Sequence, residues 1–314
     1  MLLPNLAYFA VACIFLAVSS IVLVKLLKKL AILLHITDFA AAFVIMAAAT
    51  SLPELFVGIT SAIAKKPALS LGNIIGANIL DLTLVLGIIV IAARGIKIKE
   101  KGVKRDSRVM LFMVILPFVL FIIGNSISRL DGLILLAAFF VYTCFTLKTR
   151  KRNEKKSRDK IKGIRSILLP IVLFFVCLAL LFISANAVVK YASSIALELN
   201  LPAIVIGIFL VSLGTTLPEL SFGVSAALLK QGHLSLADQI GTVIFNATFI
   251  VGITALIHPI SATFAPFILS SIFLIISSFL AIIFIESGKM LSAREGIFLV
   301  LLYILFAFVL FFIK

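Results

Sequence analysis

Two short segments of the chain each place a glutamate directly after a proline and close behind two hydroxyl side chains. Residues 50–54 read Thr-Ser-Leu-Pro-Glu, and residues 215–219 read Thr-Thr-Leu-Pro-Glu. Because proline lacks an N–H, each segment also leaves the helical carbonyl four residues before the proline without its usual donor. Carboxylate, hydroxyl and carbonyl oxygens are the ligands of hard cations such as calcium, which takes about six to eight of them. Each segment therefore predicts half of a cation site.

A second pair of polar residues follows at the same spacing in both halves of the chain. Asp81 lies 27 residues after Glu54, and Asn246 lies 27 residues after Glu219. We interpret them as a second pair of oxygen ligands. Further oxygens are available from three neighbouring side chains, Asn73, Asn78 and Thr242. Hydrogen bonding between helices is the alternative role, and it stays open above all for the two first-half asparagines.

The two glutamates lie in apolar stretches that contain no lysine or arginine at membrane depth. An ionised carboxylate in the middle of a membrane costs at least about 2.5 kcal/mol unless something compensates its charge. An internal salt bridge is excluded by this inventory of residues. Each glutamate therefore requires either a bound cation or a proton.

These segments belong to one internal repeat. Residues 50–88 align with residues 215–253 at a constant offset of 165 without a gap, and 17 of the 39 positions are identical. The matches include proline, glutamate and glycine positions, which ordinary similarity among apolar residues does not align. The repeat predicts two copies of one structural unit.

The elements that position these residues are predicted to be membrane helices. Apolar residues make up 63% of the 314 positions and charged residues only 13%, against about one-quarter charged in soluble domains. About 20 apolar residues are needed to cross a bilayer. We predict an all-α integral membrane protein with ten transmembrane helices at about 5–24, 37–64, 69–93, 108–124, 130–147, 166–189, 202–229, 235–257, 263–285 and 294–313.

The distribution of lysine and arginine predicts how these helices are oriented. With the N-terminus outside, 23 of the 28 basic residues fall in cytoplasmic loops, as the positive-inside rule requires. Orientation thus explains the net charge of +15, so we expect a lipid bilayer and no nucleic acid as the partner. The chain is predicted to lie in the cell membrane with both termini extracellular.

The most basic segment divides the chain into two halves. Residues 148–165 carry ten basic residues among eighteen and are predicted to form a cytoplasmic linker. The first five-helix repeat covers 1–147, with its ion-binding segment at 47–88, and the second covers 166–314, with its segment at 212–253. Five spans separate the copies, so the second crosses the membrane in the opposite sense. Such inverted repeats are typical of secondary transporters, which predicts alternating access around a site at the repeat interface.

The other titratable residues are interpreted as ordinary. Asp238 lies near the start of the span at 235–257. Six acids and all three histidines fall at span ends or in loops: Asp38, Asp106, Asp131, Glu198, Glu286, Glu295, His35, His233 and His258. An intramembrane enzyme would need two catalytic aspartates, a serine with a histidine, or a metal-binding glutamate and histidine. No histidine is predicted in the middle of a span, so we expect no enzyme.

The repeated segments resemble the α-repeats of the sodium/calcium exchanger family, within the calcium/cation antiporter superfamily. The resemblance rests on Ala-Thr-Ser-Leu-Pro-Glu-Leu (49–55) and Gly-Thr-Thr-Leu-Pro-Glu-Leu (214–220). Gly-Asn-Ile-Ile-Gly-Ala-Asn-Ile-Leu-Asp (72–81) and Gly-Thr-Val-Ile-Phe-Asn (241–246) complete it. The motifs cover about 80 residues directly, and the ten-span layout extends the likeness to the whole chain. The resemblance implies a prokaryotic-type antiporter that exchanges calcium for sodium.

The resemblance also implies a role for each site residue. A central calcium site would use Glu54 and Glu219 with the backbone oxygens of Thr50 and Thr215. Flanking sites for sodium, or for protons, would use Ala47, Ser51, Asp81, Ser212, Thr216, Thr242 and Asn246. No cofactor is implied beyond the transported calcium and sodium ions, and the chain is expected to function as a monomer.

Three departures from the family pattern affect the site. The family's Gly-Ser-Asn is Gly-Ala-Asn here, so Ala77 lacks a hydroxyl group. A Gly-Asn pair of the second repeat is replaced by Ala237-Asp238. Prokaryotic exchangers carry the second pair as Asn then Asp, whereas here it is Asp81 and Asn246. Proton/calcium exchange is therefore kept as the alternative function, ahead of a cation channel or an intramembrane enzyme.

Overall fold

The computed structural model describes residues 2–33, 47–98, 101–150, 165–287 and 290–312. A helix satisfies every backbone N–H and C=O within one segment, which is what apolar surroundings demand. In chain order the elements are α1 (Leu2–Leu33), α3 (Leu52–Ile63), α4 (Pro67–Leu80), π-helix η1 (Asp81–Val85), α5 (Leu86–Ala92), β1 (Ile96–Lys97), α6 (Lys101–Gly124), α7 (Arg129–Arg150), α8 (Arg165–Glu198), α9 (Ala203–Ile206), π-helix η2 (Gly207–Val211), α10 (Ser212–Thr215), α11 (Leu217–Leu228), α12 (Gly232–Ile244), π-helix η3 (Phe245–Ile250), α13 (Val251–Ile257), α14 (Phe264–Ser287), β2 (Met290–Leu291) and α15 (Ala293–Phe312).

Within the described part of the chain, eight helical stretches are long and apolar enough to cross a membrane. A bent pair, Ala203–Thr215 with Leu217–Leu228, turns by 42° and is a ninth candidate. The span predicted at 37–64 lies only partly in the described residues, where it contributes the 12-residue helix α3. The protein is therefore a nearly all-helical, multi-pass membrane protein. The number of ten spans stays a prediction.

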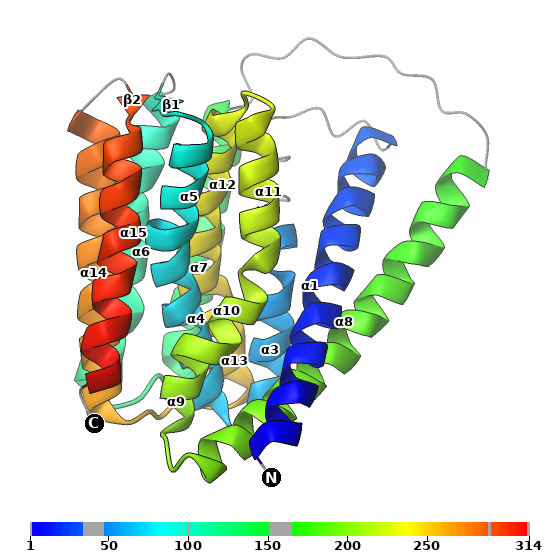
Figure 1. Cartoon of the computed structure of the whole chain (residues 1–314), viewed down its shortest axis with the longest axis vertical. Coiled ribbons are helices and arrows are strands. Elements are labelled where there is room, and N and C mark those ends of the chain that lie inside the picture. Colours follow the sequence, from blue (N-terminus) through cyan, green and yellow to red (C-terminus); the bar gives the residue numbers. More distant parts are fainter. Residues whose placement is uncertain (1, 34–46, 99–100, 151–164, 288–289, 313–314) are drawn as a thin grey trace.

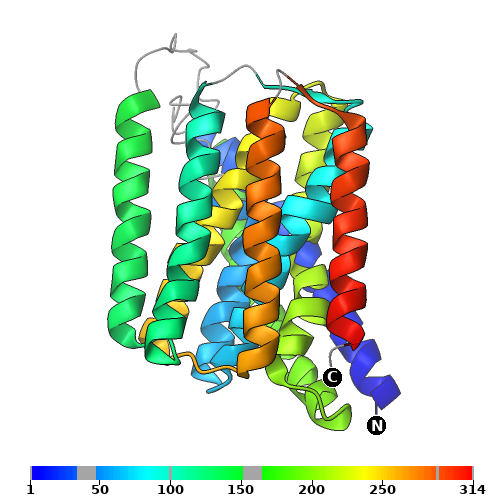
Figure 2. The same cartoon turned by 90° about the vertical axis from the view of Figure 1, so that its left-hand side faces the viewer.

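Two helical stretches form the centre of the bundle. In an 18-residue apolar window of each stretch, 83% of Pro67–Ala92 (α4, η1 and α5) and 78% of Gly232–Ile257 (α12, η3 and α13) is buried, against 22% to 44% in the other six stretches. The outer helices, such as α6, α14 and α15 in Figure 2, expose large apolar side chains as lipid-facing helices do. The polar residues predicted to bind ions thus lie on the innermost elements and on the helices packed against them.

The α4 helix packs against α9 and η2 with almost no side-chain layer between the backbones. A Cβ atom at Gly72 would lie 2.1 Å from the carbonyl oxygen of Ile204, and one at Gly76 would lie 2.2 Å from that of Ile208. Only glycine fits at these two positions, as expected for close helix packing in a membrane. The contact fixes α4 directly against the helix that leads to Thr215.

Helix bounds recur at the 165-residue offset of the sequence repeat. α3 and α11 begin at Leu52 and Leu217, and each is followed by a long helix that passes into a π-helical turn. In the first repeat this turn is η1, which begins at Asp81. In the second repeat it is η3, whose second residue is Asn246. The two copies of the repeat therefore adopt the same local structure.

The two ends of the bundle differ. α1 packs along α8 at one side of the bundle (Figure 1), where Tyr8 and Tyr191 stack with ring centroids 5.2 Å apart. Both chain ends lie at one end of the bundle in Figures 1 and 2, and the antiparallel ribbon of β1 and β2 lies at the opposite end. α1 and α8 continue to Leu33 and Glu198, past the predicted ends at 24 and 189.

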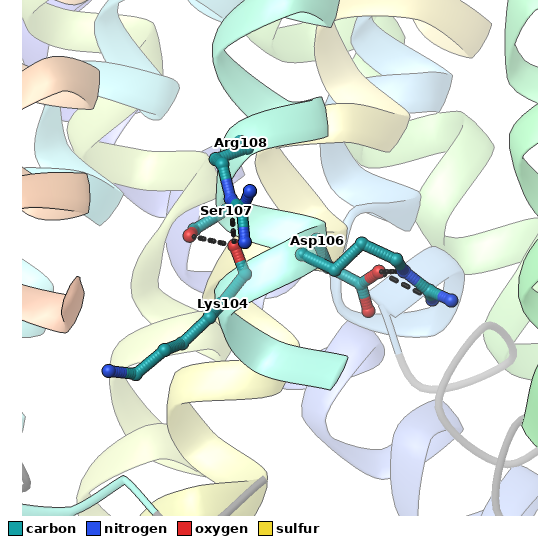
Figure 3. Close-up of polar contacts among 5 residues, drawn as sticks. Lys104, Asp106, Ser107 and Arg108 are labelled. Atoms are coloured by element: carbon teal, nitrogen blue, oxygen red, sulfur yellow. Dashed lines mark hydrogen bonds and ion pairs between the residues drawn. The ribbon is translucent and has the colours of Figure 1, made fainter. Parts of the chain in front are cut away.

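The charged residues of the first turns of α6 are held by local contacts (Figure 3). Arg105 donates two hydrogen bonds to Asp106 Oδ1, from Nε at 2.9 Å and from Nη2 at 2.7 Å. Ser107 Oγ and Arg108 Nε donate to the Lys104 carbonyl at 2.9 and 3.3 Å. The aspartate is buried but ion-paired, which confirms its interpretation as an ordinary structural residue.

Candidate functional site

Both glutamates follow a break in a helix. The break residues, Ser51 and Thr216, have nearly the same backbone angles, φ −78° and ψ 10° against φ −80° and ψ 1°. The proline that follows each break lies in the first turn of the new helix, where a missing N–H leaves no hydrogen bond unmade. Glu54 and Glu219 also lie in these first turns. The positive end of a helix dipole favours negative charge there.

At the first break, oxygens predicted as ligands contact one another. Thr50 Oγ1 donates to the Ala47 carbonyl at 3.2 Å, and the Ser51 N–H donates to the same carbonyl at 3.3 Å. Thr50 Oγ1 also lies 3.4 Å from Thr242 Oγ1 on α12. The first break is therefore in direct contact with the second copy of the repeat.

The second break shows the same arrangement. The Ser212 carbonyl accepts a hydrogen bond from Thr216 Oγ1 at 2.9 Å and lies 3.3 Å from Thr215 Oγ1. Thr215 Oγ1 also donates to Asn73 Oδ1 on α4 at 3.0 Å. Each break thus contacts the long helix of the other repeat, so the two predicted half-sites face a common interior.

The second predicted pair lies deeper in the two central helices. Asn246 Nδ2 donates to Asn78 Oδ1 at 3.0 Å, and Asn78 Nδ2 donates to the Val243 carbonyl at 3.5 Å. Interhelical hydrogen bonding, the alternative role for Asn73 and Asn78, is therefore observed. Asn246 Oδ1 and both carboxylate oxygens of Asp81 have no hydrogen-bond partner among the described residues.

The acidic side chains fall into two groups. Nine aspartates and glutamates lie in the described residues. Five have polar partners: Asp106 with Arg105, Asp131 with Ser128, Glu198 with Asn5, Glu286 with Arg108 and Glu295 with Ser292. The other four have fully or almost fully buried carboxylates without a hydrogen-bond partner among the described residues: Glu54, Asp81, Glu219 and Asp238. Buried charge without a partner is strongly unfavourable, so these four require compensation from outside the chain.

The four unpartnered carboxylates lie on elements that pack against one another. The helix of Glu219, α11, contacts η1, which begins at Asp81, and α12, which carries Asp238. Across the described ranges, however, no three acidic, histidine or cysteine side chains converge on one point suited to a metal ion. A cation held here would therefore draw most of its ligands from carbonyl and hydroxyl oxygens, as the broken helices provide.

Sequence reasoning missed Asp238. The interpretation as an ordinary residue near a span end is wrong, because α12 begins at Gly232 and Asp238 is only 2% exposed. Its neighbour Gln239 is also buried, and neither of its side-chain polar atoms has a partner among the described residues. The signal lay in the sequence, since Ser235, Asp238, Gln239 and Thr242 follow the i, i+3, i+4, i+7 spacing of one helix face.

Comparison with known proteins assigns the family. The model of the protein family described as "Sodium/calcium exchanger protein" matches residues 4–148 and 169–312, which is nearly the whole chain. The chain belongs to the sodium/calcium exchanger family. As a member it is a secondary antiporter for sodium and calcium ions, and the proton/calcium alternative is not favoured.

Relatives of this exchanger cover its whole length. An uncharacterized membrane protein of Methanocaldococcus jannaschii is 30% identical over 97% of each chain. The sodium/calcium exchanger MaX1 of Methanosarcina acetivorans is 27% identical over 100% of each chain. The solved structure of the sodium–calcium exchanger NCX_Mj soaked with 2.5 mM Na⁺ and 10 mM Sr²⁺ is 28% identical, with a TM-score of 0.69 over 97% of this chain and 98% of that one. The family predicted from the two glutamate segments is confirmed.

Proposed function

We propose that this exchanger moves calcium against sodium across the cell membrane by alternating access. Two inverted five-helix repeats, ten spans in all, would enclose a site at their interface. One observation carries the proposal: two buried glutamates, each at an equivalent helix break, form no ion pair with any described residue. Two carboxylates balance the two charges of one calcium ion.

The calcium ligands are assigned to the two breaks. Glu54 and Glu219 would supply the charge, and the backbone oxygens of Thr50 and Thr215 would supply neutral ligands. The hydroxyls of both threonines are hydrogen-bonded, which orders the chain on the N-terminal side of each break. Calcium suits such a set, because it accepts mixed carboxylate and carbonyl oxygens in flexible geometry.

The counter-ions are assigned to the flanking oxygens. The carbonyls of Ala47 and Ser212 and the hydroxyl oxygens of Ser51, Thr216 and Thr242 line the breaks. Asp81 and Asn246, each with at least one side-chain oxygen without a described partner, extend this set along the two central helices. Sodium prefers such hard oxygens, and one added carboxylate favours a monovalent ion.

The inverted arrangement accounts for alternating access. The α11–α12 turn lies beside β1, since a Cβ at Gly232 would lie 3.0 Å from Ile96 Cγ1. The start of α4 instead packs against α9, near the end where both chain termini lie (Figure 1). The equivalent turns of the two repeats, α3–α4 and α11–α12, therefore lie at opposite ends of the bundle, which supports the inversion. Each half would then adopt in turn the conformation of the other, which opens the site to one side at a time.

Transport by the purified chain tests the function. In proteoliposomes loaded with sodium, dilution into sodium-free buffer containing calcium should drive calcium uptake, whereas a pH gradient of the same driving force should not. Uptake should saturate with calcium and stop when sodium is equal on both sides. Calcium flux that follows the pH gradient alone, or that needs no counter-ion, would contradict sodium/calcium exchange.

A further inference from the structure

The α11–α12 hairpin places Asp238 at the level of Glu219. Ser235 Oγ donates to the Gly223 carbonyl at 3.1 Å, and this contact fixes the register of the two antiparallel helices. One helical turn away from the loop, about four residues on each helix, this register brings Glu219 level with Asp238 and Gln239.

One face of α12 and η3 is a continuous buried polar surface, which we name the α12 polar stripe. It consists of Ser235, Asp238, Gln239, Thr242 and Asn246, all 2% exposed or less. Thr242, one turn beyond Asp238, lies 3.4 Å from the Thr50 hydroxyl at the first break. The stripe therefore runs from the glutamate site towards the end of the bundle that carries β1 and β2.

The equivalent face of the first repeat keeps buried polar residues at Ser70, Asn73 and Asp81 but is apolar at two of the five positions. At the 165-residue offset, the positions of Asp238, Gln239 and Thr242 hold Asn73, Ile74 and Ala77. Asn73 Oδ1 accepts a hydrogen bond from a threonine hydroxyl. Asp238 and Gln239, by contrast, have four side-chain polar atoms without a partner among the described residues. Among the described residues, one of the two polar side-chain atoms of Asn73 is thus hydrogen-bonded and its Nδ2 is not, whereas neither Asp238 nor Gln239 has a hydrogen-bonded side-chain atom.

We infer that Asp238 and Gln239, together with Glu219, form an additional binding position for a monovalent metal cation, sodium or potassium, on the second-repeat side of the exchange site. Calcium and the counter-ions occupy the site in turn, so the relevant charge count is that of the counter-ion-loaded state. Glu54, Glu219 and Asp81 can then balance three monovalent cations, and Asp238 adds one further negative charge. The inference rests on the proposed exchange function and adds one coupled cation to it.

The coupling ratio of the reconstituted exchanger tests the inference. Calcium and sodium gradients are varied at zero membrane potential until net calcium flux vanishes. In a second series of measurements part of the sodium is replaced by potassium, and in a third a pH gradient is added. Asp238→Asn should transport one monovalent cation fewer per calcium. At a tenfold cation gradient, the ratio of calcium concentrations across the membrane at which net flux is zero should then differ about tenfold between the variant and the wild type. The reason is that each coupled cation contributes its own gradient. Gln239→Ile should raise the cation concentration for half-maximal exchange several-fold.

Asp131→Asn is the matched control, because it removes one carboxylate that interacts with Ser128 outside the site. It should keep the wild-type coupling ratio. If Asp238→Asn does not transport, melting temperatures of the purified proteins are compared without calcium, where added sodium or potassium should stabilise the wild type more than the variant. An unchanged coupling ratio and equal stabilisation would overturn the inference, as would a ratio that responds only to pH. Absence of sodium-driven calcium uptake in the wild type would instead overturn the proposed function itself.

Discussion

At the scale of single residues, the chemistry of this exchanger is concentrated in a few buried oxygens. Five of the nine described acids are held by hydrogen bonds or ion pairs, while four interior carboxylates have no described partner. A protein that folds around uncompensated carboxylates needs bound cations or protons to stabilise them. Substitutions at these positions should therefore alter ion binding more than folding.

The first prediction concerns the two break glutamates. Glu54→Gln and Glu219→Gln should each reduce sodium-driven calcium uptake to less than about a tenth of wild type, a loss worth at least ~1.4 kcal/mol. Each change removes one of the two charges that balance calcium while keeping the shape of the side chain. The glutamines should not destabilise the fold, because they replace carboxylates that have no described partner. Uptake above a tenth in either variant, in protein that elutes as a single species, would remove these residues from the calcium site.

The second prediction concerns Asp81 and Asn246. Asp81→Asn should preserve calcium binding, because the two glutamates remain, but it should weaken the dependence of uptake on sodium. Adding Asn246→Asp returns one carboxylate to the equivalent place in the other repeat, so the double variant should regain sodium dependence beyond either single variant. Neighbouring polar groups commonly couple by about 0.5–3 kcal/mol, which a double-mutant cycle on uptake resolves. If the effects of the two substitutions on uptake are strictly additive, or if Asp81→Asn leaves the sodium dependence unchanged, Asp81 is a structural residue and not an ion ligand.

At the scale of elements, the site depends on how closely α4 approaches η2. A large side chain between these backbones would move Asn73 away from Thr215, whose hydroxyl it binds at 3.0 Å. The glycines of α4 therefore determine the distance between the first long helix and the second break.

The third prediction tests this packing. Gly76→Ala would place a Cβ atom 2.2 Å from the Ile208 carbonyl oxygen, so the helices must separate. We expect a loss of about 1–3 kcal/mol in the free energy of unfolding, seen as a lower melting temperature, together with reduced calcium uptake. Gly124→Ala is the control, because a Cβ atom added at this position in α6 would meet no heavy atom within 4 Å. Equal melting temperatures for the Gly76 variant and the wild type would refute the close-packing requirement.

At the scale of the whole molecule, the two ends of the bundle carry different charges and different parts of the chain. Both termini lie at one end, and the β1–β2 ribbon with its neighbouring lysines lies at the other (Figures 1 and 2). The excess of basic residues in the loops on the ribbon side predicts that this side faces the cytoplasm.

The fourth prediction gives this orientation a direct test. Single cysteines replacing Asn5 and Lys66 should react with an impermeant thiol reagent added outside intact cells. Cysteines replacing Lys97 and Lys148 should react only after the membrane is opened. The native Cys13, Cys144 and Cys177 are replaced in all four variants, and the cysteine-free protein is the control for background labelling. Labelling of Lys97→Cys or Lys148→Cys from outside would contradict the orientation and the inverted sense of the two repeats.

The sequence alone was sufficient to predict the class and family of the protein. It also predicted that Pro53 and Pro218 disturb the helical hydrogen bonds before the two glutamates, because proline cannot donate one. It did not place a break there, since Pro117 and Pro170 lie inside unbroken helices. The constant offset of 165 equally predicted that α3 and α11 begin at equivalent residues. Such features depend on local covalent chemistry and on repetition, and both can be read directly from the amino-acid sequence.

The tertiary structure was needed to decide which polar residues meet and which acids remain without partners. Asp106 and Asp238 both looked like ordinary acids near span ends, yet one is paired with Arg105 and the other is buried without a described partner. Helix α12 begins earlier than the predicted span, and its hairpin with α11 brings Asp238 level with Glu219. Burial and partnership depend on the register between helices. That register is set by backbone contacts such as Gly72 against Ile204, which lie far apart in the sequence.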